Sequence, residues 1–417
     1  MRTRHVALAL LGCALLAAGA AGAATGRTAG AAAGTAVPPI NWGVADDASK
    51  YADDGGAWFY GELQGANLSE NRWTLAFDPA NPTQIDDLPF LERAAPLAQA
   101  AGVHVLLSLY SKKGSVHDPT TFCTWAQTVA QTVSQWGIHD YIVWNEPNTR
   151  LYWSPQKDSK GRDIAAPQYE ALMAACYDAI HGADPQATVI GMGLSPRAST
   201  PASNEPLTFL RDVGKAYRAS GRTTPIMDEL SIHPYPVGTG PPSVSYANPA
   251  RFGAADLARV KQAVYDAFNG TGQPTTLNGL TFVVDEMGWQ TDTTAYSQYV
   301  HAENVPTISE QTQASYLAQL ATKYFACDPT VVSVELFLLV DEKYRDGRDE
   351  SGNYLGGGWQ SGLLTAGGQG VSTPKKAYTQ DAPLFAEGRS ACAGPLVAWS
   401  PVKAKAVRKP KRKAAKT

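Results

Sequence analysis

Two glutamates each follow a short apolar segment of the chain. Glu146 comes directly after Tyr141–Asn145, and Glu286 comes directly after Phe282–Asp285. Two carboxyl groups that share one cleft can break a glycosidic bond, because one donates a proton to the leaving oxygen while the other attacks the anomeric carbon. Like charges at close range also separate the pKa values of two such groups, so that one stays protonated and the other ionised. The pair therefore predicts sugar chemistry, provided that the fold brings both side chains together.

Eight short apolar segments, which read as strands, alternate with amphipathic segments that read as helices. The strand-like segments are Ile40–Val44, Arg72–Phe77, Val103–Leu109, Tyr141–Asn145, Thr188–Gly193, Glu229–His233, Phe282–Asp285 and Val331–Val340. The helix-like segments include Leu88–Ala101, Thr121–Trp136, Tyr169–Gly182, Pro206–Ser220, Ala254–Phe268 and Ser309–Phe325. This alternation predicts an α/β protein in which parallel strands and helical crossovers close into a (β/α)8 TIM barrel. We expect one catalytic domain over residues 38–395, and no Gly-x-Gly-x-x-Gly motif follows the first segment to favour a dinucleotide fold instead.

The barrel explains how two distant glutamates can meet. Catalytic groups of such barrels lie at the carboxyl ends of the strands. Glu146 ends the fourth expected strand and Glu286 the seventh, and these strands face each other across the barrel mouth. Asp285 and Glu229 are competing candidates for the nucleophile, but the position of Glu229 within the sixth segment suits a structural carboxylate better. We therefore expect Glu146 and Glu286 to point into one cleft.

Two motifs around these glutamates carry a resemblance. Residues 144–148, Trp-Asn-Glu-Pro-Asn, resemble the strand-four signature of clan A retaining glycoside hydrolases, and residues 285–289, Asp-Glu-Met-Gly-Trp, are similar to the strand-seven nucleophile motif of that clan. The resemblance extends over roughly residues 40–385, and within the clan the chain is similar to family 5 and family 39 glycosidases. It implies that Glu146 is the acid/base, that Glu286 is the nucleophile, and that Asn145 binds the sugar 2-hydroxyl.

The resemblance also implies further sugar-binding and positioning residues. Residues 231–235, Ser-Ile-His-Pro-Tyr, resemble the strand-six His-x-Tyr element of the clan. This implies a hydrogen bond from Tyr235 to the nucleophile and a sugar contact for His233. Arg72, on the second strand, matches the clan arginine that orients the nucleophile.

The chain departs from the clan pattern in two places. Residues 335–338 read Glu-Leu-Phe-Leu and lack the strand-eight Trp that forms the floor of the sugar subsite, which leaves Phe337 or Trp359 for this role. Asp285 stands where Thr or Ser is commoner. Trp289 and Trp359 are our candidate stacking platforms, because aromatic faces pack against sugars. Three other aromatic residues near strand ends are Trp42, Tyr110 and Trp153.

The first 37 residues predict export. Residues 1–24 hold two arginines, an apolar run and small residues, which is the layout of a secretory signal peptide. A membrane anchor is less favoured because the run is short, and a lipoprotein modified at Cys13 is a further alternative. Residues 25–37, rich in Ala and Gly, are expected to form a linker. We therefore expect a secreted, extracellular protein, or one attached to the cell envelope.

The charge is distributed unevenly along the chain. The formal net charge is -3, but residues 403–417 hold eight of the 35 basic residues and the leader holds two more. The remaining 25 basic residues face 38 acidic ones, so the body is an acidic globule. Residues 396–417 are predicted to be a basic, disordered tail. The tail is either a solvated end or a contact to an anionic polymer or membrane of the envelope; an exported chain does not favour nucleic acid.

Four cysteines remain once Cys13 leaves with the leader, and an exported chain with an even number of cysteines favours disulfides. Of the three possible pairings, we favour Cys123–Cys176 with Cys327–Cys392, because each links neighbouring segments of the expected barrel. No His/Cys cluster predicts zinc, and the spacing of the acidic loop 341–353 does not match a calcium-binding EF-hand. We expect neither a metal nor an organic cofactor.

The sequence as a whole predicts a monomeric retaining glycoside hydrolase that cleaves a β-linked polysaccharide or oligosaccharide. Retention requires carboxyl groups about 5–5.5 Å apart. Two alternatives stay open, namely a transglycosylase that uses the same site and a non-catalytic glycan-binding barrel tethered to the envelope.

Overall fold

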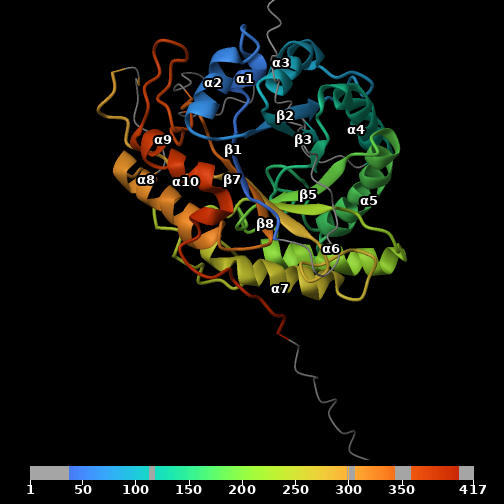
Figure 1. Cartoon of the computed structure of the whole chain (residues 1–417). Helices are drawn as coiled ribbons and strands as arrows, with labels where there is room; N and C mark the ends of the chain where they lie inside the picture. Colours follow the sequence, from blue (N-terminus) through green and yellow to red (C-terminus); the bar gives the residue numbers. More distant parts are fainter. Residues whose placement is uncertain (1–36, 112–117, 298, 300–305, 343–357, 403–417) are drawn as a thin grey trace, which may run out of the picture.

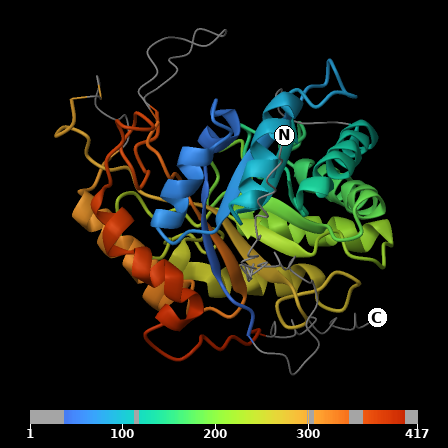
Figure 2. The ribbon, with the colours of Figure 1, turned by 45° about the horizontal axis from the view of Figure 1, so that its top comes forward.

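A closed barrel of parallel strands forms the centre of the molecule (Figure 1). The computed structural model describes residues 37–111, 118–297, 299, 306–342 and 358–402, so the predicted signal peptide and nearly all of the predicted linker lie outside the described part. The strands pair in chain order, and β1 also pairs with β8, which closes the barrel (Figure 2). They are β1 Asn41–Ala45, β2 Glu70–Phe77, β3 His104–Ser111, β4 Asp140–Val143, β5 Thr188–Leu194, β6 Glu229–Ile232, β7 Thr281–Met287 and β8 Val331–Leu336.

Helices surround the strands on the outside, and α3 to α8 follow one another around the barrel in chain order (Figure 1). The α-helices are α1 Ala48–Tyr51, α2 Ala57–Gly65, α3 Leu88–Ala100, α4 Pro119–Val133, α5 Ala165–Ala183, α6 Pro206–Ser220, α7 Leu257–Phe268, α8 Glu310–Gln319, α9 Lys376–Gln380 and α10 Ala382–Glu387. Shorter turns are the 3-10 helices η1 Ser134–Trp136, η2 Ala254–Asp256 and η4 Gly388–Ala391, and the π-helix η3 Leu320–Tyr324. The predicted (β/α)8 fold is therefore confirmed.

Burial on both faces explains why the strands are apolar throughout. Residues of β5 are all buried, as expected for a parallel strand that is covered by helices on one side and by the barrel filling on the other. Alternate strand residues fill the barrel as a separate apolar cluster, distinct from the larger core between strands and helices. This cluster comprises Leu106, Ile142, Ile190, Val283 and Val332.

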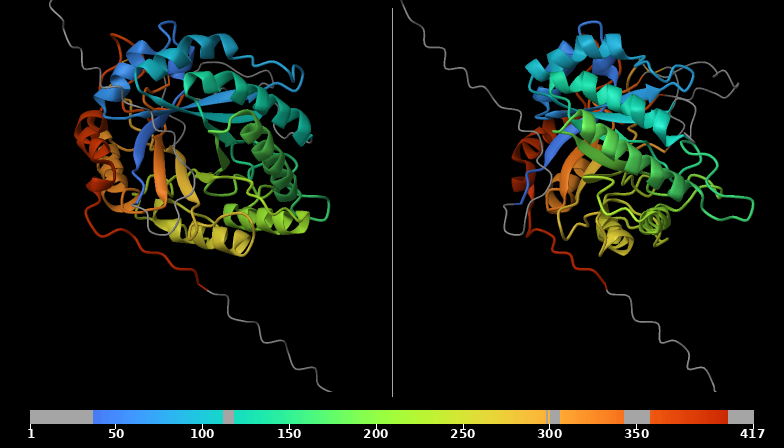
Figure 3. Two further views of the ribbon diagram at one scale, coloured as in Figure 1. Left: turned by 45° about the vertical axis from the view of Figure 1, so that its right-hand side comes forward. Right: turned by 90° about the vertical axis from the view of Figure 1, so that its right-hand side faces the viewer.

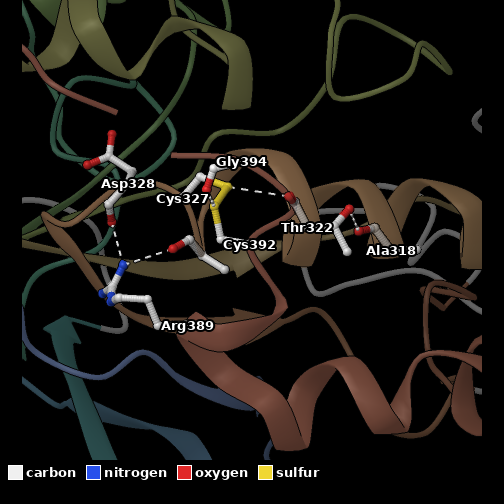
Figure 4. The surroundings of a disulfide bond; sticks show 8 residues. Ala318, Thr322, Cys327, Asp328, Arg389, Cys392 and Gly394 are labelled. Atoms are coloured by element: carbon white, nitrogen blue, oxygen red, sulfur yellow. Dashed lines mark hydrogen bonds between the residues drawn. A yellow bond between two sulfur atoms is a disulfide. The ribbon is translucent and has the colours of Figure 1, made fainter. Parts of the chain in front are cut away.

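Both predicted disulfides are present. Cys123–Cys176 joins α4 to α5, and Cys327–Cys392 joins the end of η3 to the segment after η4. Figure 4 shows the second bridge, with Arg389 nearby donating a hydrogen bond to the carbonyl oxygen of Asp328. Each bridge thus ties together two elements that are adjacent in the barrel order.

Removing the Cys123–Cys176 bridge is expected to destabilise the barrel. The bridge constrains the unfolded chain across a sequence separation of 53 residues, and both cysteines are buried. We expect the double variant Cys123→Ser/Cys176→Ser to lose about 2–4 kcal/mol of unfolding free energy. Urea unfolding of the oxidised wild type and the variant measures this difference. An unchanged midpoint and slope would contradict it.

The first residues of the predicted tail, 396–402, contact the barrel. The main-chain nitrogen of Val397 donates to the carbonyl oxygen of Cys327, and Val402 N–H donates to the side chain of Gln262 on α7. Between them, the ring of Trp399 packs against Tyr265, at 6.5 Å between centroids. Both views of Figure 3 show this segment, in red, running past α7. Residues 396–402 are therefore held on the barrel, because an aromatic ring and backbone hydrogen bonds fix them there.

No helix in the described part of the chain combines the length and apolar character needed to cross a membrane.

Candidate active site

Glu146 and Glu286 line one cleft of about 960 Å³ at the carboxyl ends of the strands. Glu286 lies near the end of β7, and Glu146 follows β4 directly after a short extension. Their side chains are 18% and 15% exposed, so both are accessible while most of each carboxyl group is surrounded by protein. The structure thus places the two predicted glutamates in the same cavity.

The imidazole of His233 lies between the two carboxyl groups. Its Nδ1 atom is 3.2 Å from Oε1 of Glu146 and 3.6 Å from Oε2 of Glu286. These two oxygens can be no farther apart than the sum of the two distances, about 7 Å, an upper bound that includes the roughly 5–5.5 Å separation of retaining glycosidases. The two carboxyl groups therefore lie close together, on either side of one nitrogen of His233.

Glu286 is held from two sides by hydrogen-bond donors. The Nη1 atom of Arg72 lies 3.2 Å from Oε1, and the Tyr235 hydroxyl donates to Oε2 at 3.1 Å. Burial raises the pKa of Glu286 above its ordinary value, and the positive charges of His233 and Arg72 offset part of this rise. The donors favour the ionised form that a nucleophile needs. The contact from Tyr235 is the one that the strand-six resemblance implied.

Arg72 is itself fixed within the barrel. It is 5% exposed, and its Nη2 atom donates to the Ser108 hydroxyl at 3.0 Å and to Oδ1 of Asn145 at 3.2 Å. Burial alone would lower the pKa of Arg72, but Glu286 and Asp285 raise it above its ordinary value. Arg72 therefore stays charged and orients both Asn145 and Glu286.

The side chain of His233 lies below the cleft. The resemblance implied a sugar contact, but the side chain is fully buried beneath the glutamates and is absent from the cleft lining. Gly193, at φ 50°, allows this packing, since a Cβ atom there would lie 3.3 Å from Nε2 of His233. Its contacts are with the carboxyl groups of Glu146, Glu286 and Asp285, and the expected sugar contact stays a prediction.

The chain leaves the extended conformation directly after β4. The fourth strand ends at Val143 rather than Asn145, because Trp144 has φ 78° and Glu146 has φ 44°, values that non-glycine residues seldom adopt. Packing of Trp144 against Trp153, at 4.9 Å between ring centroids, and a hydrogen bond from Glu146 N–H to the Gly193 carbonyl oxygen fix this turn. Such strain costs roughly 1–3 kcal/mol per residue and aims the Glu146 side chain into the cleft.

Aromatic side chains surround the two acids in the cleft. Trp289 and Trp359 both line it, as does Phe337, whose ring lies 5.7 Å from that of Trp359. Trp359 is 47% exposed and offers a free face, whereas Trp289 is 4% exposed. The other aromatic residues of the cleft are Tyr51, Tyr110, Tyr152 and Tyr235, while Trp42 and Trp153 are buried in the core. Our sequence reasoning missed Tyr152, although its place in the loop after β4 is a usable signal.

A second, polar groove of about 560 Å³ adjoins the cleft at Ser199, which lines both. Its walls come from the loops after β4, β5 and β6 and from α6, on the side of the barrel that carries Glu146. The charged residues of this groove are Lys157, Asp163, Glu205, Asp212 and Arg251. The concave surface therefore continues beyond the two acids.

Among the described residues, no group of three or more His, Cys, Asp or Glu side chains is arranged to hold a metal ion. Asp341, at the start of the acidic loop, is paired with Lys375 at 2.6 Å. Residues 343–353 of that loop lie outside the described part.

Comparison with solved structures finds the same fold. The chain is similar to a family 39 glycoside hydrolase from the gut symbiont Bacteroides cellulosilyticus WH2, with a TM-score of 0.54 and 16% identity over 84% of this chain and 64% of that one. It is similar to a monomeric β-xylosidase from Caulobacter crescentus CB15, with a TM-score of 0.52 and 16% identity over 84% of this chain and 69% of that one. It is also similar to a family 1 β-glucosidase from Thermotoga maritima, with a TM-score of 0.53 and 10% identity over 86% of this chain and 98% of that one. No family model and no curated protein matches the chain. The chain therefore has the (β/α)8 barrel fold of these glycoside hydrolases, which the motifs at residues 144–148 and 285–289 had implied.

Proposed function

We propose that this protein is a glycosidase that hydrolyses O-glycosyl bonds of a β-linked glycan with retention of configuration. The observation that carries the proposal is the pair Glu146 and Glu286, which share one cleft and are joined by the imidazole of His233. The fold that the chain shares with a β-xylosidase and a β-glucosidase supports a substrate of this class. Two disulfides and the leader at residues 1–24 support secretion.

The proposed reaction takes place in two displacements at the anomeric carbon. In the first, a carboxylate oxygen of Glu286 forms a bond to the anomeric carbon, and the glycosidic C–O bond breaks as Glu146 gives its proton to the leaving oxygen. In the second, Glu146 takes a proton from water, the water oxygen attacks the anomeric carbon, and the bond to Glu286 breaks. Two inversions at the same carbon leave the configuration unchanged.

The two alternatives, a transglycosylase and a glycan-binding barrel, make different demands on the site. A transglycosylase replaces the water of the second displacement by a sugar hydroxyl, so it yields longer products when acceptor sugars are present. A glycan-binding barrel needs no ionised carboxylate beside an acid, and the donors that converge on Glu286 from Arg72 and Tyr235 favour an enzyme instead.

Product stereochemistry tests the proposal. The purified protein is screened against β-glucans, mannan, xylan and arabinogalactan, and proton NMR follows the first sugar released from the best substrate. We expect the β-anomer to appear before mutarotation produces the α-anomer. An α-anomer as first product, or no turnover on any glycan in the presence of a working control enzyme, would overturn the proposal.

The second groove indicates that the substrate is a chain rather than a single glycoside. It continues from the cleft at Ser199 on the side of Glu146, and the leaving group lies beside the general acid. Its hydrogen-bonding side chains suit sugar hydroxyls. We infer that the groove binds the leaving-group units of a polysaccharide, so that the enzyme cuts within chains.

Narrowing the junction tests this inference. The exposed Ser199 lies where the cleft and the groove meet. We expect Ser199→Trp to lower kcat/KM roughly tenfold on a hexasaccharide, corresponding to the loss of about 1.4 kcal/mol of binding, with little change on an aryl monoglycoside. Ser199→Ala is the matched control and should behave as wild type on both. Equal effects of Ser199→Trp on the two substrates would contradict an extended site.

A further inference from the structure

Asp285, the residue before the proposed nucleophile, is fully buried between two cations. Its Oδ1 atom lies 3.1 Å from Nε2 of His233, and its Oδ2 atom lies 3.4 Å from Nε of Arg72. Arg72 and His233 also reach the two oxygens of Glu286, at 3.2 and 3.6 Å. The four side chains therefore form a closed ring of alternating charge, in which Asp285 occupies the buried side and Glu286 the side that faces the cleft.

Glu146 is attached to this ring through His233. Nδ1 of the imidazole lies 3.2 Å from Oε1 of Glu146 and Nε2 lies 3.1 Å from Oδ1 of Asp285, so a carboxyl group stands at each ring nitrogen and favours the protonated ring. Burial alone would lower the pKa of His233, but the charges of Asp285 and Glu286 raise it well above the ordinary value. Geometry and charge thus agree on an imidazolium at this position.

Counting charges shows what Asp285 contributes. Before the first displacement, Arg72 and His233 carry two positive charges, Asp285 and Glu286 carry two negative charges, and protonated Glu146 is neutral. After it, Glu286 is a neutral ester and Glu146 is a carboxylate, so the sum is again zero. With a neutral residue at 285 the sum is positive in both states, and a positive cluster favours loss of the proton from Glu146 or from His233.

We propose that Asp285 is a positioning residue that orients His233 and offsets the positive charges of His233 and Arg72, so that these cations do not draw the proton from Glu146 before it is delivered to the leaving oxygen. The inference rests on the proposed function, and it assigns a role to a residue that departs from the Thr or Ser commoner in similar motifs. The proton moves from the Glu146 carboxyl group to the glycosidic oxygen, and Asp285 and His233 keep their charges throughout.

The other titratable groups around the cluster are four tyrosines and the carboxyl group of Asp47, which acts on Arg72 and lines the cleft. The Tyr235 hydroxyl bonds to Glu286, and the nearby charges act on Tyr152, Tyr110 and Tyr169 as well. Burial raises the pKa of each, so all four are neutral in the range where a glycosidase works. Within the cluster, the charge is therefore carried by the two cations and the three carboxyl groups.

Neutralising Asp285 tests the proposal through the pH profile. In Asp285→Asn, Glu146 and His233 should lose their protons at lower pH than in the wild type. The fall of kcat/KM on the alkaline side of the pH profile, its alkaline limb, is therefore expected to move to lower pH by about one unit or more. Asp285→Thr, which introduces a residue common in similar motifs, should shift the limb in the same direction. In a His233→Gln background, Asp285→Asn should shift the limb less, because the imidazolium whose charge Asp285 offsets beside Glu146 is already absent.

A second buried ion pair supplies the matched control. Asp328 pairs with Lys261 at 2.7 Å and is equally buried, but neither residue lines the cleft. Asp328→Asn should lower the melting temperature and leave the limb where it is. If Asp285→Asn destabilises the protein in the same way and its limb also stays in place, the role is structural and the proposal is wrong.

A readout independent of turnover separates this inference from the proposed function. Nitrogen-15 NMR of His233 and carbon-13 NMR of Glu146 follow each proton directly, with Asp285→Asn expected to move both midpoints to lower pH. If the wild type has no glycosidase activity, the proposed function fails, and the Glu146 titration still decides whether Asp285 holds that proton. An active wild type with unmoved midpoints in Asp285→Asn refutes the inference alone.

Discussion

Replacing Glu286 with glutamine is expected to lower kcat by at least about 10⁴-fold on every substrate, a loss of the size seen when a catalytic nucleophile is removed from other hydrolases. The amide cannot form the covalent bond to the anomeric carbon, and the variant lacks the negative charge with which Arg72 and Tyr235 interact. Rates on the best glycan and on an activated aryl glycoside measure the loss.

Two further variants make this result specific. Glu286→Ala leaves space for added azide, which would attack from the face that Glu286 normally occupies and form a glycosyl azide of inverted configuration. Glu170→Gln removes a carboxylate from α5 that bonds to Ser220 outside the cleft, and it should stay within about twofold of wild type. A Glu286→Gln protein with ordinary turnover would exclude Glu286 as the nucleophile.

Replacing Glu146 with alanine is expected to act selectively. An alkoxide leaving group needs the proton that Glu146 supplies, so natural glycans should lose about 10²–10⁴-fold in kcat/KM. An aryl glycoside with a strongly acidic phenol needs little protonation, and its first displacement should be nearly unaffected. The ratio of the two rates therefore measures proton donation directly, independently of folding.

The second displacement gives a check with the opposite requirement. Without Glu146 no base activates the water, so the glycosyl-enzyme accumulates, and azide should accelerate its breakdown to a glycosyl azide of retained configuration. The anomer of the azide product thus tells the two glutamates apart. Equal losses on glycans and activated aryl glycosides would show that Glu146 is not the acid.

The barrel could be predicted because parallel strands buried on both faces leave a strong local signal. All eight apolar segments coincide with a strand, and Pro206–Ser220 is a helix with the predicted bounds. The shared cleft of Glu146 and Glu286 could be predicted because strand ends in a barrel converge. The pairing of Cys123 with Cys176 followed from the same neighbour relation of α4 and α5.

The features that could not be predicted depend on three-dimensional packing. Nothing in the sequence shows that Trp144 turns out of the strand, since this requires the contact with Trp153 from a later loop. The sequence does not show that the imidazole of His233 packs closely against Gly193 and pairs with Asp285, which keeps this side chain buried below Glu146 and Glu286. The anchoring of residues 396–402 depends on Trp399 finding Tyr265, a contact that composition does not encode.

Trapping the covalent intermediate tests the central claim most directly. In a 2-deoxy-2-fluoro glycoside, the fluorine slows both displacements, while a good leaving group speeds up the first one again. The glycosyl-enzyme therefore persists, and mass spectrometry of its peptides shows which residue carries the sugar. We predict one sugar per molecule, attached to Glu286, with no label on the Glu286→Gln variant. A label on any other side chain, or a wild type that hydrolyses its substrate yet never carries the sugar, would show that Glu146 and Glu286 do not act as the catalytic pair.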